Sequence, residues 1–497
     1  MEVTTERGLT TVWLDEEIGV LPDDRGGDME KQVHAAAKEQ PLTDRPCCVG
    51  IDIGTTTVCA YVLRLDDGVP VGIFSIRNAA DLPALFVGDK RQDADRLFDR
   101  VRHMLDAVLH RCPTVCAIGF TGQMHGMLCT DANGHALTPL YTWQDQRAAI
   151  GERSAAAVIT EQTGHKVAAG YGLATFYTLL RADEIPDDTA RICTVMDYAA
   201  ARLCGKPVGI MHTTNAASLG LFDLSRGIFD VSALERLGIA PALLPRVTDA
   251  PEIIGMYRGI PVTVPIGDNQ ASFLGAVQDP GTTVLANFGT GSQISLLSPG
   301  SILGCSCGAV ETRPFPGSRY LLSGAALCGG RAYAMLERFF RSFYIAAGGE
   351  DRELYETLNR LAGEELDSDS VMRLTVKTTF CGTRDDPEAA GAVLGIREAQ
   401  FTPGALAAGV LRGMAEELHS MYETMPHTQI TQLAASGNAI RRNPVLRRIL
   451  SDVFGMPVSV PAAEEEAAFG AAMYAAVGAG YAANIADLGS WVRYQCG

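Results

Sequence analysis

The stretch VGIDIGTTTVCAYV, residues 49–62, places an aspartate at the end of an apolar segment and continues with glycine and three threonines. The β-branched residues on either side predict two strands, over 47–53 and 57–64, joined by a tight turn. Asp52 would be costly to bury unpaired at a strand end, so it requires a cation, either a lysine or a metal ion. The glycine lets the backbone approach a ligand, and the threonines supply hydroxyl and amide donors. The phosphates of a nucleotide with their magnesium ion are one ligand that this turn could hold, and the rest of the sequence can be tested against that hypothesis.

A second stretch repeats this arrangement about 235 residues later. LANFGTGSQISLL, residues 285–297, again joins two apolar strands through a Gly-Thr turn. In both stretches a strand, and not a helix, follows the glycines, which argues against a Walker loop or a dinucleotide-binding fingerprint. A plain β-turn is the simpler interpretation of either hairpin taken alone. The pair suggests a duplicated architecture that binds one ligand from two sides.

The composition is that of a globular protein with more than one domain. The 497 residues exceed one ordinary core, and 47% hydrophobic with 20% charged residues is typical of a folded chain. The 41 basic and 58 acidic residues give a net charge of -17, which argues against a nucleic-acid partner and against an anionic membrane. Residues 1–45 are polar and have no sustained hydrophobic period, so we expect them to form an N-terminal extension.

The 13 cysteines are scattered, and the acidic N-terminus lacks the apolar run of a secretory leader. We therefore expect a cytoplasmic protein with reduced thiols. The closest pairs, Cys112 with Cys116 and Cys305 with Cys307, have no second pair or histidine cluster to complete a zinc site. The alanine-rich segment 467–484 is too weakly apolar for a membrane span and predicts a tightly packed interior helix.

Short β-branched runs alternate with longer amphipathic segments from residue 47 onward, which predicts an α/β protein. The strands are expected at 47–53, 57–64, 116–120, 261–266, 283–287, 292–297, 431–435 and 457–460. The helices are expected at 95–111, 147–162, 173–183, 231–236, 329–344, 403–424 and 443–453.

Three motifs in this order resemble those of the actin-like ATPase superfamily. They are GIDIGTTT at 50–57 for the first phosphate motif, NFGTGS at 287–292 for the second, and LAASGNAIRRNPVLRRILSDVFGMPVSVP at 433–461 for the adenosine motif. Within the superfamily, FTGQMHGMLCTD and YTWQDQRA look like the FGGY carbohydrate kinases. GYGLATFYTLL, TTNAASLGLFDL, IGDNQASFLGAV and LRGMAEELHSMY resemble the members of that family that act on sedoheptulose.

The resemblance covers about residues 47–480 and implies two ribonuclease H-like domains with an interdomain cleft. ATP is expected in that cleft with Mg2+, and the domains are expected to close around the sugar. We place the sugar and first phosphate motifs in an N-terminal domain at 46–264. The catalytic aspartate, the second phosphate motif and the adenosine motif then fall in a C-terminal domain at 265–497.

Asp268 in VPIGDNQASF follows the strand at 261–266 and opens a segment of small residues. On position alone it is interpreted as a helix N-cap, for which aspartate is a preferred residue. The resemblance instead implies the catalytic base, because the family's base lies in this G-D-N motif. Phosphoryl transfer asks the protein mainly to orient the attacking hydroxyl and to accept its proton late, which a carboxylate can do. The resemblance makes Asp52 the second catalytic residue, holding magnesium through water.

The resemblance also implies which residues bind the nucleotide. In the first half they are Gly54, Thr55, Thr56 and Thr57, and in the second half Gly289, Thr290, Gly291, Ser292, Gly330, Gly437 and Asn438. Arg441 and Arg442 are expected to face solvent. Family members usually carry a lysine or arginine where this chain has Cys59, a departure that removes one charged contact to the phosphates.

The sugar-binding residues that the resemblance implies are Gln123, Met124, His125, Trp143, Asp145, Asp268 and Asn269. The imidazole can both donate and accept hydrogen bonds, as a ketose with several hydroxyls requires. Trp143 offers an aromatic face to the carbon side of the sugar. Asp145 and Arg147 form either a structural ion pair or a direct contact, and Asn215 in TTNAAS is a weaker candidate.

We therefore expect an ATP-dependent kinase that phosphorylates a primary hydroxyl of a ketose, with sedoheptulose, giving sedoheptulose 7-phosphate, favoured over xylulose or another sugar or polyol. The two ketoses differ by roughly 2.5 Å of reach, whereas attack requires reacting atoms about 3–3.5 Å apart. A non-catalytic actin-like sugar sensor is the alternative of a different class, and it would keep the hairpins while losing the base. The sequence leaves the oligomeric state open, with a homodimer as one option.

Overall fold

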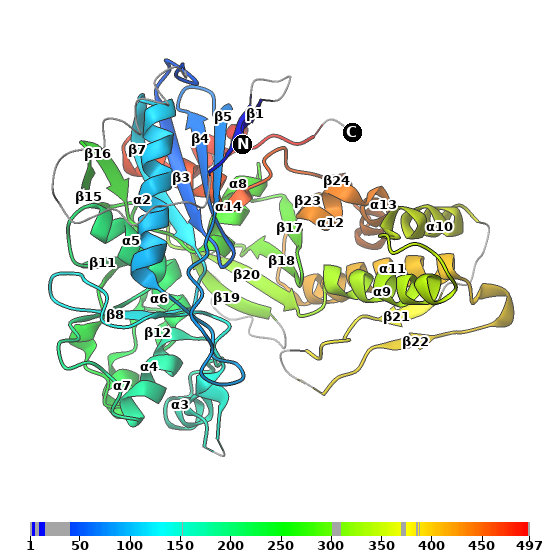
Figure 1. Cartoon of the computed structure of the whole chain (residues 1–497), viewed down its shortest axis with the longest axis horizontal. Coiled ribbons are helices and arrows are strands. Elements are labelled where there is room, and N and C mark those ends of the chain that lie inside the picture. The colour runs from blue at the N-terminus through cyan, green and yellow to red at the C-terminus, as the bar shows by residue number, and fades with distance from the viewer. Residues whose placement is uncertain are drawn as a thin grey trace. The chain divides into compact units, whose positions relative to one another are not determined.

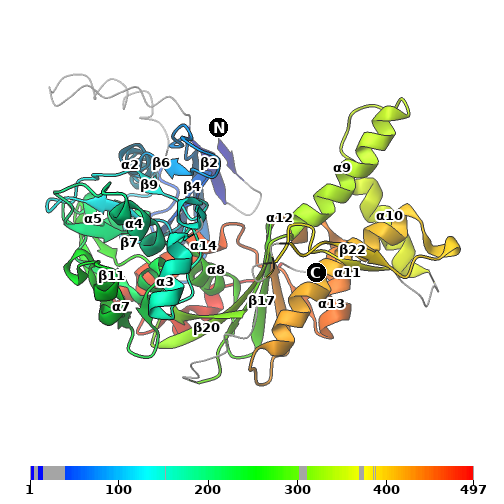
Figure 2. The same ribbon diagram turned by 90° about the horizontal axis from the view of Figure 1, so that it is seen from below.

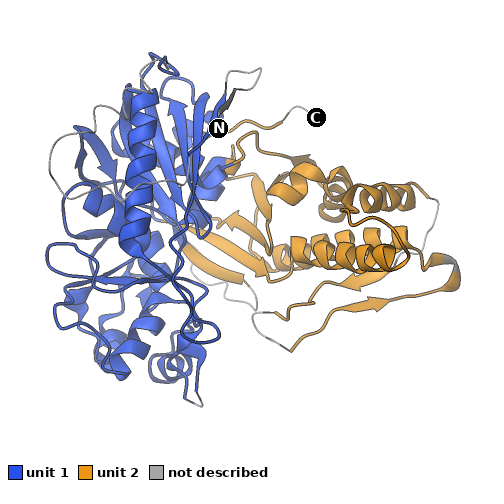
Figure 3. Ribbon diagram, in the orientation of Figure 1, with its two compact units in different colours: residues 1–275, 314–318, 465–491 blue, residues 276–313, 319–464, 492–497 orange. Residues whose placement is uncertain are grey.

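The computed structural model (Figure 1) describes residues 2–4, 9–14, 40–151, 153–300, 310–368, 374–383, 386 and 388–495. Helices and mixed sheets alternate along the chain, which confirms the expected α/β class. The chain forms two compact units, each built from non-contiguous segments (Figure 3). Unit 1 comprises residues 1–275, 314–318 and 465–491, and unit 2 comprises 276–313, 319–464 and 492–497.

The main sheet of unit 1 has the strand order β1-β2-β5-β4-β3-β7-β16-β15. The strands β3, β7 and β16 run parallel, and β4 is antiparallel to both β3 and β5. Their bounds are β1 Glu2–Thr4, β2 Thr10–Trp13, β3 Cys47–Ile53, β4 Thr57–Arg64, β5 Pro70–Arg77, β7 Val115–Gly122, β15 Ile253–Tyr257 and β16 Ile260–Thr263.

Shorter strands and eight helices complete the description of unit 1. The helices are α2 Ala94–Arg111, α3 Ala155–Thr163, α4 Gly172–Arg181, α5 Val195–Leu203, α6 Thr213–Leu219, α7 Val231–Arg236, α8 Asp268–Ala276 and α14 Glu466–Gly478. The strands are β6 Arg91–Gln92, β8 Leu128–Thr130, β9 Leu140–Tyr141, β10 Arg191–Cys193, β11 Ile210–His212, β12 Phe222–Asp223, β13 Ile228–Phe229 and β14 Arg246–Thr248.

Helix α14 packs directly on the main sheet because small residues line the contact. A Cβ on Gly50 would lie 2.0 Å from the carbonyl oxygen of Ala468, and one on Gly119 would lie 2.2 Å from that of Ala471. Most of the helix is buried, which confirms the expected interior helix, although it ends at Gly478. The same helix crosses α8, where a Cβ on Gly470 would lie 1.9 Å from the carbonyl oxygen of Ala271.

The sheet of unit 2 has the order β19-β20-β18-β17-β23-β24. Its strands are β17 Thr283–Phe288, β18 Ser292–Leu297, β19 Val310–Phe315, β20 Arg319–Ala326, β23 Gln432–Ser436 and β24 Val458–Ser459, with β21 Thr375–Lys377 and β22 Ala392–Leu394 forming a separate pair. The order β20-β18-β17-β23-β24 repeats the order β5-β4-β3-β7-β16 of unit 1. In unit 2 β18 is antiparallel to β17, just as β4 is antiparallel to β3 in unit 1. The two units therefore share one topology, as the repeated hairpins suggested.

The helices of unit 2 are α9 Gly330–Ala346, α10 Tyr355–Asp367, α11 Pro403–Thr424, α12 Asn438–Arg442 and α13 Pro444–Phe454. Helix α11 packs against both α10 and α13 (Figure 2). Its observed bounds match the expected ones, and Thr402 caps it by accepting a hydrogen bond from the amide of Ala405.

Three expectations need correction. The helix expected at 147–162 is interrupted, because a 3-10 turn at Arg147–Ala149 is followed by Gly151 at φ 92°, and α3 begins only after its N-cap Ser154. The strand expected at 261–266 ends at Thr263. Residues 10–13, for which no strand was expected, pair in parallel with β5, because the sequence TTVW suits a strand and the sheet edge offers backbone partners.

The domain boundary expected between residues 264 and 265 stays a prediction. Asp268 lies in unit 1, and the segment 465–491 belongs to the same unit. No helix within the described ranges is long and apolar enough to cross a membrane. The ten described cysteines are free thiols, and Cys305 and Cys307 lie outside the described residues.

Candidate active site

Three carboxylates gather at one edge of the main sheet of unit 1. Asp52 is the penultimate residue of β3, Asp268 is the first residue of α8, and Glu465 immediately precedes α14. Burial, together with the negative charges of Asp268 and Glu465, raises the pKa of Asp52 to about 8. Both sequence-predicted catalytic residues thus lie within electrostatic reach of each other. Glu465 was missed, because it is more than 400 residues from Asp52 in the chain and reaches the site only through the packing of α14.

The first predicted phosphate turn links β3 to β4. The amide of Gly54 donates to the carbonyl oxygen of Thr57 at 3.0 Å, which closes the turn. The hydroxyl of Thr55 donates to Oε1 of Gln123 at 3.4 Å and accepts from the indole of Trp143 at 3.2 Å. The turn is therefore joined by side chains to two residues that the sequence predicted on the sugar side. Thr56 is exposed, and Thr57 begins β4.

Met124 and His125 follow β7 at the same edge of the sheet. His125 has φ 72°, an unusual value for a residue with a side chain, and its ring stacks on Tyr171 at 4.6 Å between centroids. Its Nδ1 lies 2.9 Å from the carbonyl oxygen of Ser218, which can only accept. Nδ1 must therefore carry the proton, and Nε2 is left as the acceptor in the neutral ring.

Asp145 and Arg147 form a buried ion pair. The carboxylate of Asp145 is fully buried and accepts from Nε of Arg147 at 2.7 Å and from the amide of Lys90 at 3.0 Å. The guanidinium also stacks over Tyr141 at 4.2 Å. Of the two alternatives considered for this pair, these contacts support the structural one. Trp143, by contrast, is 47% exposed and offers a face for a ligand.

The segment at the start of α6 anchors the backbone before Asp268. Asn215 is fully buried, and its amide donates to the carbonyl oxygen of Pro265 at 3.1 Å. The hydroxyl of Thr214 accepts from the amide of Gly267 at 3.0 Å. Through these contacts the motif TTNAAS supports the loop that precedes Asp268. Asn269, the second residue of α8, is also buried.

The second predicted phosphate turn lies in unit 2, at Gly289, Thr290 and Gly291 between β17 and β18. The first amides of α9 hold it, because Gly330 donates to the carbonyl oxygen of Gly289 at 2.9 Å and Arg331 to that of Thr290 at 3.1 Å. Ser292 starts β18 and is buried. The approach leaves no room for side chains, since a Cβ on Gly329 would lie 2.4 Å from the carbonyl of Gly291.

Gly437 and Asn438 lie beside this turn, at the junction of β23 and α12. Gly437 has φ 95°, and a Cβ there would lie 2.4 Å from the carbonyl oxygen of Phe288. The predicted nucleotide residues of unit 2 are thus brought together. Arg441 was expected to face solvent, but it is half-buried and its guanidinium donates to the carbonyl oxygens of Pro461 and Ala463, the former at 2.8 Å. Arg442 is exposed as expected.

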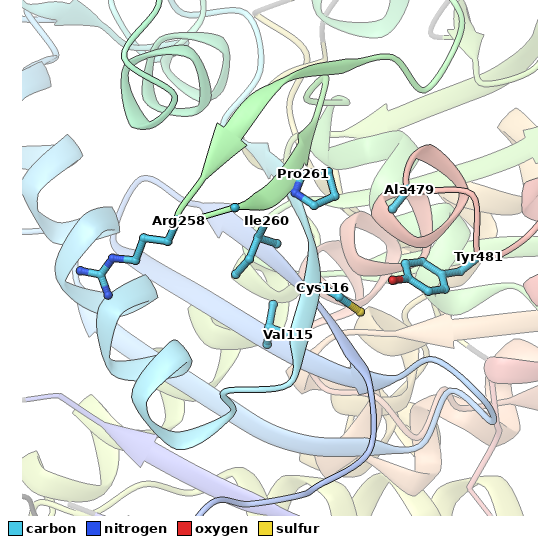
Figure 4. A pocket seen from close by; sticks show the side chains of 8 residues that line it. Val115, Cys116, Arg258, Ile260, Pro261, Ala479 and Tyr481 are labelled. Atoms are coloured by element: carbon cyan, nitrogen blue, oxygen red, sulfur yellow. The ribbon is translucent and has the colours of Figure 1, made fainter.

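A cavity of about 300 Å³ lies elsewhere in unit 1 (Figure 4). The residues that line it include Val115, Cys116, Ile260 and Tyr481. They lie where β7 and β16 begin and where the chain leaves α14. Since β7 begins at Val115 and ends at Gly122, roughly 25 Å of strand separates this cavity from the carboxylate edge. The cavity is therefore distinct from the predicted site.

The carboxylate edge fits a hard divalent cation. Carboxylate oxygens are the ligands that magnesium prefers, and the pKa of Asp52 is raised first by burial and then by the negative charges of Asp268 and Glu465 at this edge. Thr121 lies beside Asp52 in register on β7, and its hydroxyl is buried without a partner among the described residues. No three His, Cys, Asp or Glu side chains in the described ranges are arranged to chelate a metal directly.

Two family models match the chain. The model for the N-terminal domain of the FGGY family of carbohydrate kinases matches residues 47–285, and the model for its C-terminal domain matches residues 287–479. Sedoheptulokinase from Mus musculus is 28% identical over 473 residues, which cover 87% of this chain and 98% of that protein. Glycerol kinase from Rhodospirillum rubrum is 28% identical over 478 residues, which cover 90% of this chain and 93% of that protein.

Solved structures share the fold. Xylulose kinase from Rhodospirillum rubrum superposes with a TM-score of 0.76 at 23% identity and covers 90% of this chain and 93% of its own. Gluconate kinase from Lactobacillus acidophilus gives a TM-score of 0.78 at 19% identity, with 91% and 93% covered. These similarities confirm the expected two-domain α/β fold.

Proposed function

The chain belongs to the FGGY family of carbohydrate kinases, and from this premise we propose that it transfers the γ-phosphate of ATP to a primary hydroxyl of a ketose, sedoheptulose before others. Family membership makes it an ATP-dependent sugar kinase. The observation that carries the proposal is the pairing of Asp52 at the end of β3 with Asp268 at the start of α8, within electrostatic reach. A sugar sensor without catalysis would have no need of the second carboxylate.

Two observations support sedoheptulose as the substrate. The sedoheptulokinases from Mus musculus and Homo sapiens are each 28% identical to this chain over 87% of its length. The motif stretches that resemble this branch include TTNAAS, whose side chains support the loop before Asp268. Glycerol kinases are as similar in identity, so a shorter polyol is the alternative within the family, as is xylulose.

Asp268 acts as the base in the proposed reaction. It orients the sugar hydroxyl and accepts its proton as the oxygen attacks the γ-phosphorus, while the bond from that phosphorus to the β-phosphate oxygen breaks and ADP leaves. Gly267 carries no side chain, and a Cβ there would lie 2.6 Å from Sδ of Met124. The residue that precedes the base therefore lies close to Met124, a predicted sugar-binding residue.

The turn at residues 54–57 and the turn at 289–292 bind the phosphates in this proposal. Their amides and the threonine hydroxyls stabilise charge as it spreads over the transferred group. Asp52 would hold a magnesium ion through water, and a bound ion would neutralise phosphate charge there. Trp143 would cover the carbon side of the sugar while its indole hydrogen-bonds Thr55 of the first turn.

The test is ADP release with ATP and magnesium for sedoheptulose, D-xylulose, D-ribulose and glycerol, measured for the wild type, Asp268→Ala and Asp99→Ala. Asp99 is a matched control because it is an exposed aspartate of α2 that pairs with Arg102. We expect preference for sedoheptulose and a loss of roughly 10²–10⁴ in rate for Asp268→Ala alone. Activity on xylulose or glycerol alone would overturn the substrate, and full activity of Asp268→Ala would overturn the base.

A further inference from the structure

The carbonyl groups of the first phosphate turn all point into the protein. The carbonyl oxygen of Gly54 accepts from Nδ2 of Asn78 at 2.8 Å, and that of Thr55 accepts from Nε2 of Gln92 at 2.9 Å. The carbonyl oxygen of Thr56 accepts from the backbone amide of Asn78 at 3.0 Å. Two side-chain amides and one main-chain amide therefore hold three successive carbonyls.

The direction of these carbonyls fixes the direction of the amides that follow them. In a planar trans peptide the C=O and the N–H point to opposite sides. The N–H groups of Thr55, Thr56 and Thr57 consequently point away from Asn78 and Gln92. Successive N–H groups aimed outward form an anion-binding concavity, whereas a carbonyl turned outward would place partial negative charge against a phosphate.

The turn of unit 2 has the same arrangement by different means. There the carbonyl oxygens of Gly289 and Thr290 accept from the first backbone amides of α9. In unit 1 the side chains of Asn78 and Gln92 bond the turn carbonyls, where unit 2 uses the first backbone amides of α9. In both predicted phosphate sites, hydrogen bonds from neighbouring amides therefore hold the carbonyl oxygens of the turn.

The neighbours of Gln92 define the orientation of its amide. Its Nε2 also donates to Oδ1 of Asp81 at 3.0 Å, and both of its partners on that side can only accept. Its Oε1 accepts from Nε2 of Gln123 at 2.9 Å and from Nδ2 of Asn78 at 3.3 Å. Gln92 is fully buried, so every one of these bonds is shielded from water.

We propose that Gln92 and Asn78 are positioning residues for nucleotide binding, which hold the carbonyls of the turn inward so that its amides face the phosphates. Gln92 also ties the turn to the sugar side, because Gln123 bonds both Gln92 and Thr55. This inference rests on the proposed function in one respect, namely that the turn at 54–57 binds phosphate. Neither residue touches the nucleotide itself.

The test uses Gln92→Met, which keeps the length of the side chain without its amide, and Asn78→Asp, which keeps the acceptor for the amide of Ala80 but removes the donor to Gly54. Gln432→Glu is the control. Gln432 is the first residue of β23, at the opposite end of that strand from Gly437, and the substitution removes the amide donor to the hydroxyl of Ser459. For each protein we would measure the KM for ATP, the KM for the best sugar, kcat, and unfolding in urea.

Both variants should raise the KM for ATP about tenfold, as expected from losing buried hydrogen bonds worth roughly 1–2 kcal/mol. The KM for the sugar should change less than threefold in Asn78→Asp, which has no contact with Gln123. The control should leave both constants unchanged. Equal rises in both KM values, or an unchanged KM for ATP in a folded variant, would overturn the inference. Should Gln92→Met fail to fold, Asn78→Asp decides by the same two constants.

A parallel measurement on Asp52→Asn separates this inference from the proposed function. If Asp52→Asn abolishes turnover while Gln92→Met and Asn78→Asp bind ATP normally, the phosphate site stands and the positioning role is wrong. If Asp52→Asn is fully active, the phosphate site itself is elsewhere, and the positioning role fails with it.

Discussion

Asp52 on β3 and Cys59 on β4 lie directly opposite each other in the antiparallel hairpin, so their side chains project from the same face of the sheet. Cys59 is buried, and burial together with the charges of Glu465 and Asp52 raises the pKa of its thiol well above the usual value. A neutral thiol therefore occupies the position where the family resemblance implies a lysine or arginine. The absence of that cation agrees with the raised pKa of Asp52.

Cys59→Lys should lower the pKa of Asp52, because a neighbouring cation favours the charged carboxylate. With the wild-type pKa at about 8, a large part of Asp52 is protonated at pH 7. In the variant we expect the rising limb of the plot of kcat/KM for ATP against pH to shift to lower pH by about one pH unit. Cys59→Met is the control, since it adds length without charge. The same movement in Cys59→Met would assign the effect to packing.

Asp52→Asn should stabilise the folded protein, and increasingly so as the pH rises. The folded pKa of Asp52, about 8, is above the value of 3.8 for the free side chain, so the folded wild type binds more protons between those values. The stability that protonation of Asp52 contributes to the folded state is complete below about pH 4 and is lost as the pH rises through 8. The variant has no such loss, and its advantage in urea unfolding without magnesium should grow by about 1–3 kcal/mol from pH 5 to pH 8. A pH-independent difference would contradict the raised pKa.

Local pattern was sufficient to predict the two hairpins, because their signals are alternating apolar residues and glycines within one short stretch. The strands at 57–64 and 292–297 and the helix at 403–424 have the expected bounds. The helix expected at 147–162 failed where Gly151 and the cap at Ser154 outweighed the apolar spacing.

Residues that act through the fold could not be predicted in this way. Gln92 and Asn78 lie in segments with no motif, and they meet the phosphate turn only because β3, β4 and β5 are neighbours. Glu465 comes from a run of three glutamates that gives no sign of which one faces Asp52. Asn78 immediately follows β5, a strand that the sequence analysis did not identify, and recognising that strand would have placed Asn78 at this edge.

Gly267→Ala should weaken sugar binding without affecting ATP. The new Cβ would lie 2.6 Å from Sδ of Met124 and 2.6 Å from Oε1 of Gln270, so the flexible methionine must move. We expect the KM for the sugar to rise about tenfold, which corresponds to about 1.4 kcal/mol, and the KM for ATP to stay constant. Gly209→Ala is the control, because a Cβ there has open space. The double variant with Met124→Ala should recover part of the loss, and a double variant no better than Gly267→Ala would show that Met124 is not the cause.

Gly437→Ala should impair nucleotide binding in unit 2 for two reasons. The position has φ 95°, which strains any side chain, and the added Cβ would lie 2.4 Å from the carbonyl oxygen of Phe288, next to the turn at Gly289. Gly455→Ala separates the two causes, since Gly455 has φ 65° and open space around a Cβ. Both variants should lose about 1–2 kcal/mol of stability from backbone strain. Calorimetric titration with ADP should show at least tenfold weaker binding for Gly437→Ala only, and equal weakening in Gly455→Ala would assign the effect to stability instead of the contact with β17.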